Sequence, residues 1–168
     1  MDSVSPEASG RAAPTDAGFG RRICVQVERM VDAPMERVWV VLRDYRAVRP
    51  RMLTEHFADY AVQQREGERT VIDYRLRVGR HQRLVVAAVE EPMAGRQLRE
   101  RDVHSALVIT WTLTPGGDGE RTVVRLAAEL RDPDINGRLA RGRARRALRQ
   151  LYGQLLEHLD AYLAADAT

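Results

Sequence analysis

The chain has 168 residues, of which 44% are hydrophobic and 30% charged, and its formal net charge is +3. This composition is typical of one soluble globular domain, and it excludes a membrane-spanning helix because no apolar run approaches about 20 residues. Every permanently basic residue is arginine, which excludes chemistry that needs a lysine, such as Schiff-base formation. Cys24 is the only cysteine, so an intrachain disulfide is excluded and a reducing, cytoplasmic location is favoured.

The first 20 residues are rich in Ser, Ala, Gly and Pro and have no hydrophobic period, which predicts a disordered leader. This stretch also lacks the apolar run of a signal peptide. Residues 21–166 are expected to form a single domain. Alternation of apolar and polar residues predicts its first strand at 22–30, where Ile23, Val25 and Val27 share one face. Cys24 is expected to be a small, buried hydrophobic residue.

A short helix is predicted at 34–43. Asp32 is a favourable N-cap, and Pro34 is tolerated in a first helical turn. An apolar stripe then follows at helical spacing, at Met35, Val38, Trp39 and Leu42. Residues 44–56 are expected to form irregular turns, broken at Pro50, that act as the entrance to any internal cavity.

From Phe57 onward apolar residues alternate with polar ones, and turn residues recur about every ten positions. Strands are therefore predicted at 57–65, 69–78, 82–91, 96–102, 105–114 and 121–130. The alternation is clearest in 72–78, 107–113 and 124–130. Sheets with one apolar and one polar face are typically antiparallel, so we expect an antiparallel sheet of six to seven strands that curls through its own twist.

One long helix is predicted from Ile135 to Ala165, with Asp132 and Asp134 as possible caps. Its apolar stripe recurs at steps of three and four, at Leu148, Leu151, Tyr152, Leu155, Leu159 and Tyr162. Arginine occupies the opposite surface of the first half, at Arg138, Arg143, Arg145, Arg146 and Arg149. Wrapping the curved sheet around this helix is the simplest way to bury both apolar surfaces.

Three local patterns occur in order along the chain. The first is Val31-Asp32-Ala33-Pro34 followed by Val38-Trp39, the second is VVAAVEEPMAGRQLR at 85–99, and the third is the run at 110–122. They resemble the first strand-to-helix junction, the central hairpin and the penultimate hairpin of the START-like superfamily, which includes the polyketide cyclase/dehydrase and lipid-transport family. The resemblance covers residues 22–165 and implies an α+β helix-grip fold, with two short helices after the first strand. It also implies a cavity between sheet and helix that holds a small apolar molecule.

Candidate ligand contacts are large residues predicted to face that cavity. Tyr74 lies in the middle of an apolar strand face, where a buried phenol contacts either a ligand carbonyl or a backbone group. Tyr60 and Tyr152 support the same argument, whereas core packing is favoured for Trp111. The predicted ligand-binding site comprises Tyr60, Tyr74, Leu76, Trp111, Leu148, Tyr152 and Leu155.

Two interpretations are open for a group of polar residues around a turn. Alternation places Glu100, Asp102 and His104 on one side of a hairpin, where a carboxylate and an imidazole can act as an acid–base pair. An exposed, charged hairpin beside Arg99 and Arg101 is the favoured explanation. No spacing matches a zinc or iron site, a phosphate loop or a dinucleotide fingerprint, so no metal or cofactor is predicted and the catalytic residues stay unknown.

The preferred hypothesis is a cytoplasmic protein that binds or transports a small, apolar, partly oxygenated molecule, such as a polyketide, lipid or quinone. One alternative is a polyketide cyclase or dehydratase that uses cavity tyrosine and arginine groups with a carboxylate or histidine, so enzymatic activity stays an open question. A second is a protein- or RNA-interaction module that uses the arginine surface of the last helix. A net charge of +3 makes a nucleic-acid partner unlikely, membrane insertion is not expected, and the oligomeric state is undefined.

Overall fold

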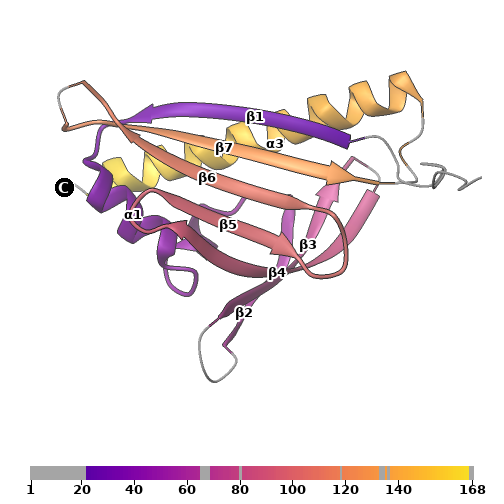
Figure 1. The fold of residues 1–168 in the computed structure, drawn as a ribbon, viewed down its shortest axis with the longest axis horizontal. Coiled ribbons are helices and arrows are strands. Elements are labelled where there is room, and N and C mark those ends of the chain that lie inside the picture. Colours follow the sequence, from indigo (N-terminus) through magenta and orange to yellow (C-terminus); the bar gives the residue numbers. More distant parts are fainter. Residues whose placement is uncertain are drawn as a thin grey trace, which may run out of the picture.

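The computed structural model describes residues 22–64, 69–79, 81–117, 119–132, 135 and 137–166. The predicted leader, residues 1–20, lies outside the described residues. The element order is β1 (Arg22–Val31), α1 (Met35–Arg43), α2 (Arg49–Met52), β2 (Phe57–Gln64), β3 (Thr70–Val78), β4 (His81–Met93), β5 (Gln97–Asp102), β6 (Val108–Pro115), β7 (Thr122–Arg131) and α3 (Arg138–Ala165) (Figure 1). All but α2 fall within a few residues of the predicted ranges. Helix α2 lies in the segment predicted as irregular turns broken at Pro50, and Pro50 instead lies in its first turn, where its missing N–H costs the helix nothing.

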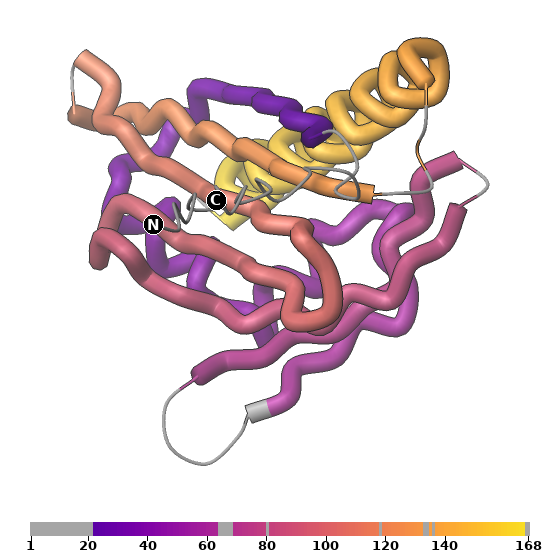
Figure 2. The backbone as a smooth tube through the Cα atoms, turned by 45° about the vertical axis from the view of Figure 1, so that its right-hand side comes forward, coloured from indigo at the N-terminus to yellow at the C-terminus, as the bar shows by residue number. Residues whose placement is uncertain are grey.

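The strands form one seven-stranded antiparallel sheet in the order β1-β7-β6-β5-β4-β3-β2. Strands β2 to β7 therefore pair in sequence order, and β1 pairs with β7. Helices α1 and α2 connect β1 and β2, which are the two edges of the sheet. The sheet curls around α3 (Figures 1 and 2), which confirms the predicted α+β helix-grip architecture.

The core lies between α3 and the concave face of the sheet. Strand β7 shows the predicted alternation, since Val124 and Leu126 are buried whereas Arg125 and Glu129 are exposed. The same period buries residues of β3 and β6, because alternate side chains of a strand point to opposite faces. Helix α3 contributes Leu148, Leu151, Tyr152, Leu155, Leu156, Leu159 and Leu163. Each buried leucine stabilises the fold by about 1.5–3 kcal/mol.

The helix α3 is packed along only part of its length. Its first buried residue is Leu148, and none of the described residues 138–147 is buried. The helix begins after Gly137, whose φ of 85° is accessible to glycine at little steric cost. Asp132, expected as a cap, instead forms an ion pair with Arg83 at 2.7 Å. Tyr162, predicted to be in the apolar stripe, is only half-buried.

Cys24 is exposed, which makes the expectation of a buried cysteine wrong. The alternation of β1 turns Ile23 and Val25 inward and Cys24 outward, where it lies opposite Glu129 of β7. The position of Cys24 in the strand decides its exposure, and the usual preference of cysteine for buried positions does not. No helix in the described part of the chain combines the length and apolarity needed to cross a bilayer.

Candidate functional site

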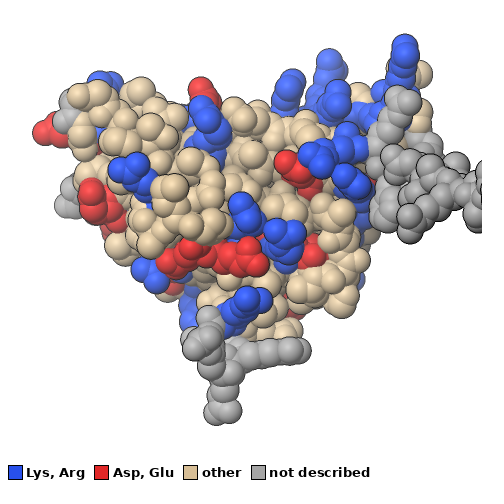
Figure 3. Space-filling model, viewed as in Figure 1, with Lys and Arg blue, Asp and Glu red and all other residues tan. Residues whose placement is uncertain are grey.

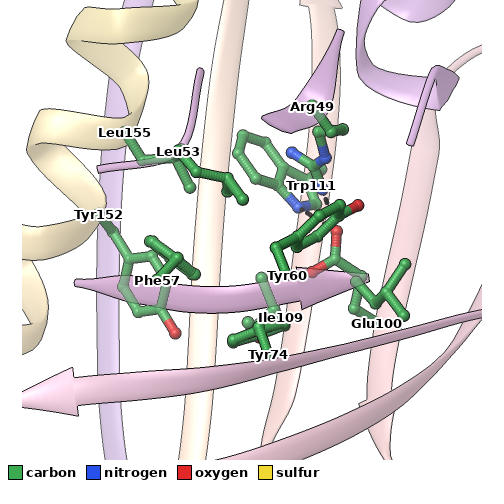
Figure 4. Close-up of a pocket in the computed structure, with 11 residues that line it drawn as sticks. Arg49, Leu53, Phe57, Tyr60, Tyr74, Glu100, Ile109, Trp111, Tyr152 and Leu155 are labelled. Atoms are coloured by element: carbon green, nitrogen blue, oxygen red, sulfur yellow. Dashed lines mark hydrogen bonds and ion pairs between the residues drawn. The ribbon is translucent and has the colours of Figure 1, made fainter. Parts of the chain in front are cut away.

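A small internal cavity lies between α3 and the inner face of the sheet. Its volume is about 20 Å³, which holds about one water molecule. Arg49, Trp111 and Glu100 cluster at one end, and Tyr152 projects from α3 at the other (Figure 4). The lining residues come from α2 and the loop after it, four strands and α3, namely Arg49, Leu53, Phe57, Tyr60, Ile72, Tyr74, Glu100, Ile109, Trp111, Tyr152 and Leu155.

A buried ion pair joins α2 to β5 at this cavity. The guanidinium of Arg49 contacts Oε1 of Glu100, and only 3% and 5% of these two residues are exposed. The Tyr45 hydroxyl and the Trp111 Nε1–H each donate a hydrogen bond to the same oxygen at 3.1 Å. Burying two charges is favourable only where both are paired and hydrogen-bonded, and these donors meet that condition for Glu100.

Aromatic rings enclose the guanidinium of Arg49. It lies 4.4 Å from the ring centroid of Trp111 and 4.9 Å from that of Tyr45, both within cation–π range. Burial lowers the pKa of Arg49, but the Glu100 carboxylate and nearby tyrosines raise it by more, so the net shift is upward. Arg49 is therefore a permanent cation inside the fold.

Three polar atoms around the cavity are buried without a hydrogen-bond partner among the described residues: Arg49 Nη1 and the hydroxyls of Tyr74 and Tyr152. Such atoms are uncommon, because more than about 90% of buried polar groups are paired. Burial raises the pKa values of both phenols, and the electrostatic interaction between Tyr74 and Tyr152 raises that of Tyr74 further. Both phenols therefore keep their protons at neutral pH and act as hydrogen-bond donors.

Two further aromatic side chains from β2 close the cavity. Phe57 lies 5.3 Å from the Tyr74 ring and Tyr60 lies 6.4 Å from it, measured between centroids. The Tyr60 hydroxyl donates to the backbone carbonyl of Tyr45 at 3.0 Å. Tyr60 is therefore fixed by the protein itself, unlike Tyr74 and Tyr152.

A larger space lies beside the first half of α3. This cleft has a volume of about 590 Å³, within the roughly 300–1,000 Å³ range of small-molecule sites. Leu76 and Leu148 line the cleft, whereas Tyr74 and Tyr152 line the small cavity. Tyr74 and Leu76 are two residues apart on one face of β3, and Leu148 and Tyr152 are four residues apart on one face of α3. The cleft and the cavity are therefore neighbours along both elements.

The seven predicted ligand contacts are divided between these two spaces. Five surround the small cavity, and Leu76 and Leu148 line the cleft. The space at the predicted site is thus nearly filled, and the larger opening lies one helical turn away. Trp111 is packed in the core, as expected, and also donates to Glu100. That these residues contact a ligand stays a prediction.

The favoured explanation of Glu100 and Asp102 as part of an exposed hairpin is wrong. Both carboxylates are buried, whereas His104 is exposed. Asp102 accepts hydrogen bonds from the backbone N–H groups of Val86 and His104 and from the Ser105 hydroxyl, so it holds the turn together. The alternative acid–base pair is not formed, because the strand ends at Asp102 and only the backbone of His104 reaches the carboxylate.

Sequence reasoning missed Arg49 and Tyr45. Both lie in the segment expected to form irregular turns, where arginine usually indicates solvent exposure. One signal was available: Glu100 shares the inward face of β5 with Leu98, and a carboxylate there requires a cationic or hydrogen-bonding partner. The partner is 51 positions away in sequence, so no local pattern identifies it.

Two remaining predictions concern the turn segment and metals. The segment 44–56 contributes Arg49 and Leu53 to the cavity wall, whereas His56 is held by a 3.1 Å contact between Nδ1 and the Arg77 carbonyl. Its role as an entrance stays a prediction. Among the described residues, no group of three or more His, Cys, Asp or Glu is placed to hold a metal ion.

The curved seven-stranded sheet and the long helix that it grips define a START-like fold. The chain belongs to the polyketide cyclase/dehydrase and lipid-transport family, whose model matches residues 22–164. This membership supports ligand binding or cyclase function in general, without specifying a substrate or the residues involved. No curated protein matches the sequence.

Solved structures show the same fold. The KanY protein, studied by NMR, is 26% identical, with a TM-score of 0.74 over 86% of this chain and 99% of that one. TTHA0849 from Thermus thermophilus is 23% identical, with a TM-score of 0.71 over 86% and 99% of the two chains. The Zhui aromatase/cyclase from Streptomyces sp. R1128 is 15% identical, with a TM-score of 0.71 over 88% and 97%.

Proposed function

We propose that the protein binds a small, largely apolar molecule that carries carbonyl or hydroxyl oxygens, between α3 and the sheet. The observation that supports this best is the set of three buried donors without partners among the described residues, on Arg49, Tyr74 and Tyr152. One ligand oxygen would accept hydrogen bonds from the two tyrosine hydroxyls, and a second ligand oxygen would accept one from Arg49. The ligand would thus supply hydrogen bonds that the free protein lacks.

Binding requires the small cavity and the cleft to join. A space of about 20 Å³ cannot hold such a molecule, whereas the adjoining cleft of about 590 Å³ can. Leu76 and Leu148 line the cleft next to the tyrosines, so rotation of the two leucine side chains would open one continuous site. The apolar body would occupy the cleft, at about 25 cal/mol per Å² of buried apolar area, and the oxygens would reach the donors.

The matched probes 1-tetralone and tetralin test this proposal, because they share a carbon skeleton and differ in one carbonyl. Displacement of an apolar fluorophore gives both affinities. We expect the preference for the ketone to fall about fivefold for each hydroxyl removed in Tyr74→Phe and Tyr152→Phe, since a neutral hydrogen bond contributes about 1 kcal/mol. Tyr162→Phe is the matched control, since its half-buried side chain does not line the cavity. Failure of both probes to bind, or the same preference in all variants, contradicts the proposal.

The same donors support a second candidate, a cyclase or dehydratase. A permanent cation at Arg49 and two neutral phenols would stabilise the oxyanion that forms when a polyketone cyclises. Among the described residues, Glu100 is the only carboxylate that lines the cavity, and its Oε1 already accepts from three donors. We therefore assign it to positioning.

A linear poly-β-ketone distinguishes the two candidates. An enzyme would accelerate its cyclisation, followed by aromatic absorbance, and Tyr74→Phe would abolish that acceleration while changing affinity about fivefold. A binding protein would change the affinity alone. The cytoplasmic location stays a prediction.

A further inference from the structure

The first half of α3 carries a second surface, which we call the basic face. It consists of six arginines in 12 residues, Arg138, Arg141, Arg143, Arg145, Arg146 and Arg149. The first acidic residue of the helix is Glu157. Basic side chains gather at the end of the molecule where α3 begins (Figure 3; compare Figure 1).

The arginines of the basic face have no acidic partner among the described residues. None of its six members forms an ion pair with a described residue. On the second half of the same helix, Asp160 pairs with Arg29 at 2.7 Å, and Asp166, just after the helix, pairs with Arg37 at 3.2 Å. Within the described part of the chain, no ion pair neutralises the charge of the basic face.

The basic face also opposes the stability of the helix. Arg138 lies in the first turn, where the helix dipole is positive and an acidic residue is favoured. Arg141, Arg145 and Arg149 follow at intervals of four, a spacing at which like charges repel. Folding does not favour this arrangement, although each repulsive pair costs only about 0.2–0.5 kcal/mol.

We propose that the basic face docks on an anionic lipid membrane. Arg138, Arg141, Arg145 and Arg149 form one stripe, and Arg146 spreads the charge onto its flank, whereas Arg143 lies on the side of the cleft. A broad, convex layer of charge suits the evenly charged surface of a bilayer better than a shaped acidic groove. Leu139 is 79% exposed beside these arginines and adds an apolar side chain that enters the headgroup region.

The cleft and the arginine stripe lie on different sides of the first half of α3. Arg143 belongs to the basic face and also lines the cleft of about 590 Å³. The other α3 residues that line the cleft are Ala140, Ala144, Ala147 and Leu148. They lie on the side of the helix away from the arginine stripe, so docking would leave the cleft uncovered. Single-stranded nucleic acid is disfavoured, because residues 138–150 contain no aromatic side chain on which a base could stack. The docking surface does not depend on the identity of the ligand.

Vesicle cosedimentation of the full-length protein tests this inference. The vesicles contain one part phosphatidylglycerol to two parts phosphatidylcholine, and pure phosphatidylcholine is the reference. Each arginine near an anionic surface is worth about fivefold in affinity, so the triple variant Arg138→Gln, Arg145→Gln and Arg149→Gln should bind about 100-fold more weakly. Raising the salt from about 50 to about 300 mM should release the wild type.

The matched control removes the same charge elsewhere. Arg22, Arg75 and Arg125 are exposed and each pairs with an acidic residue, so their triple replacement by Gln should leave vesicle binding nearly unchanged. Loss of binding in the α3 variant, with no fall in its melting temperature, supports the proposal.

Three results overturn the proposal. The first is an absence of binding to the anionic vesicles at low salt, and the second is equal losses in the two triple variants. The third is binding of poly-glutamate or RNA as tight as that of the vesicles, which would indicate a protein or nucleic-acid partner.

Discussion

The two halves of α3 differ in their contacts with the rest of the protein. From Leu148 onward the helix buries six leucines and a tyrosine against the sheet, and Asp160 is paired with an arginine of β1. None of residues 138–147 is fully buried or acidic, and the segment borders a large cleft. One continuous helix thus serves packing at one end and presents charge and an opening at the other.

This difference shows where sequence is constrained by folding and where it is free for recognition. The packed half needs apolar residues of the right size, because interiors are close-packed and tolerate little change of volume. The first half has no such constraint, so its six arginines require a different explanation. Substitutions placed in the two halves should therefore have very different effects on stability.

The largest effect is expected from the ion pair at the packed end of the molecule. Arg49→Ala leaves Glu100 buried without its cation, and should lower the free energy of unfolding by about 3–5 kcal/mol. Urea denaturation measures this. Arg145→Ala, on the basic face, should change it by less than about 0.5 kcal/mol. Restoration of stability in the double variant Arg49→Met, Glu100→Gln is the internal check, and a mild effect of Arg49→Ala alone contradicts the account.

A matched pair of leucines compares the two halves directly. Leu155→Ala creates a cavity beneath α3 and should lower the free energy of unfolding by about 2–5 kcal/mol. Leu139 is exposed, so Leu139→Ala should change it by less than about 0.5 kcal/mol. Thermal and urea unfolding report both values. Similar losses at the two positions would mean that the first half is packed as tightly as the second.

Alkaline pH should destabilise the protein through the two tyrosines buried between the sheet and the packed half of α3. The pKa values of Tyr74 and Tyr152 are raised above 10.0 in the folded protein. Below about pH 10 these tyrosines are protonated in the folded and the unfolded protein, and their contribution to stability is complete. Above about pH 10 the tyrosines of the unfolded chain release protons that those of the folded protein keep. The free energy of unfolding therefore falls as the pH rises toward and through the folded pKa values. Each tyrosine contributes about 1.4 kcal/mol per pH unit to that slope, and Tyr74→Phe with Tyr152→Phe should make it shallower. Urea midpoints between pH 9 and 11 measure the slope, and an unchanged slope in the double variant contradicts the assignment.

The smallest effect is expected at the start of α3, and its sign is the informative part. Arg138→Glu places a negative charge at the positive end of the helix dipole and should raise the free energy of unfolding by about 0.3–1 kcal/mol. The melting temperature should therefore rise slightly. A decrease would show that Arg138 has a structural partner and would weaken the case for the basic face.

Much of the fold was predictable because its signals are local. The alternation in β6 and β7 and the three-four spacing in α3 each arise from the geometry of a single element. The same alternation placed Cys24 on an outer face and Glu100 on an inner face, yet the usual preferences of a thiol and a carboxylate predicted the reverse. In both cases strand geometry prevailed, because Glu100 has compensating donors and Cys24 needs none.

The site was predictable only in part because it depends on contacts between distant segments. Tyr74 and Tyr152 were expected in the cavity from their own elements. Arg49 was not, since its burial depends on Glu100, and Tyr45 contacts the same carboxylate from 55 positions away. The volume of the cavity was likewise unpredictable, because it is what remains after all the surrounding side chains have packed.

The most direct test of the central claim is the infrared carbonyl band of bound 1-tetralone. If Tyr74 and Tyr152 donate to the ligand oxygen, the band should lie at lower frequency in the complex with the wild-type protein than in a hydrocarbon solvent. In the complex with the Tyr74→Phe, Tyr152→Phe variant it should return toward the hydrocarbon value. A band at the hydrocarbon frequency in the wild-type complex would show that the ligand oxygen accepts nothing from these donors.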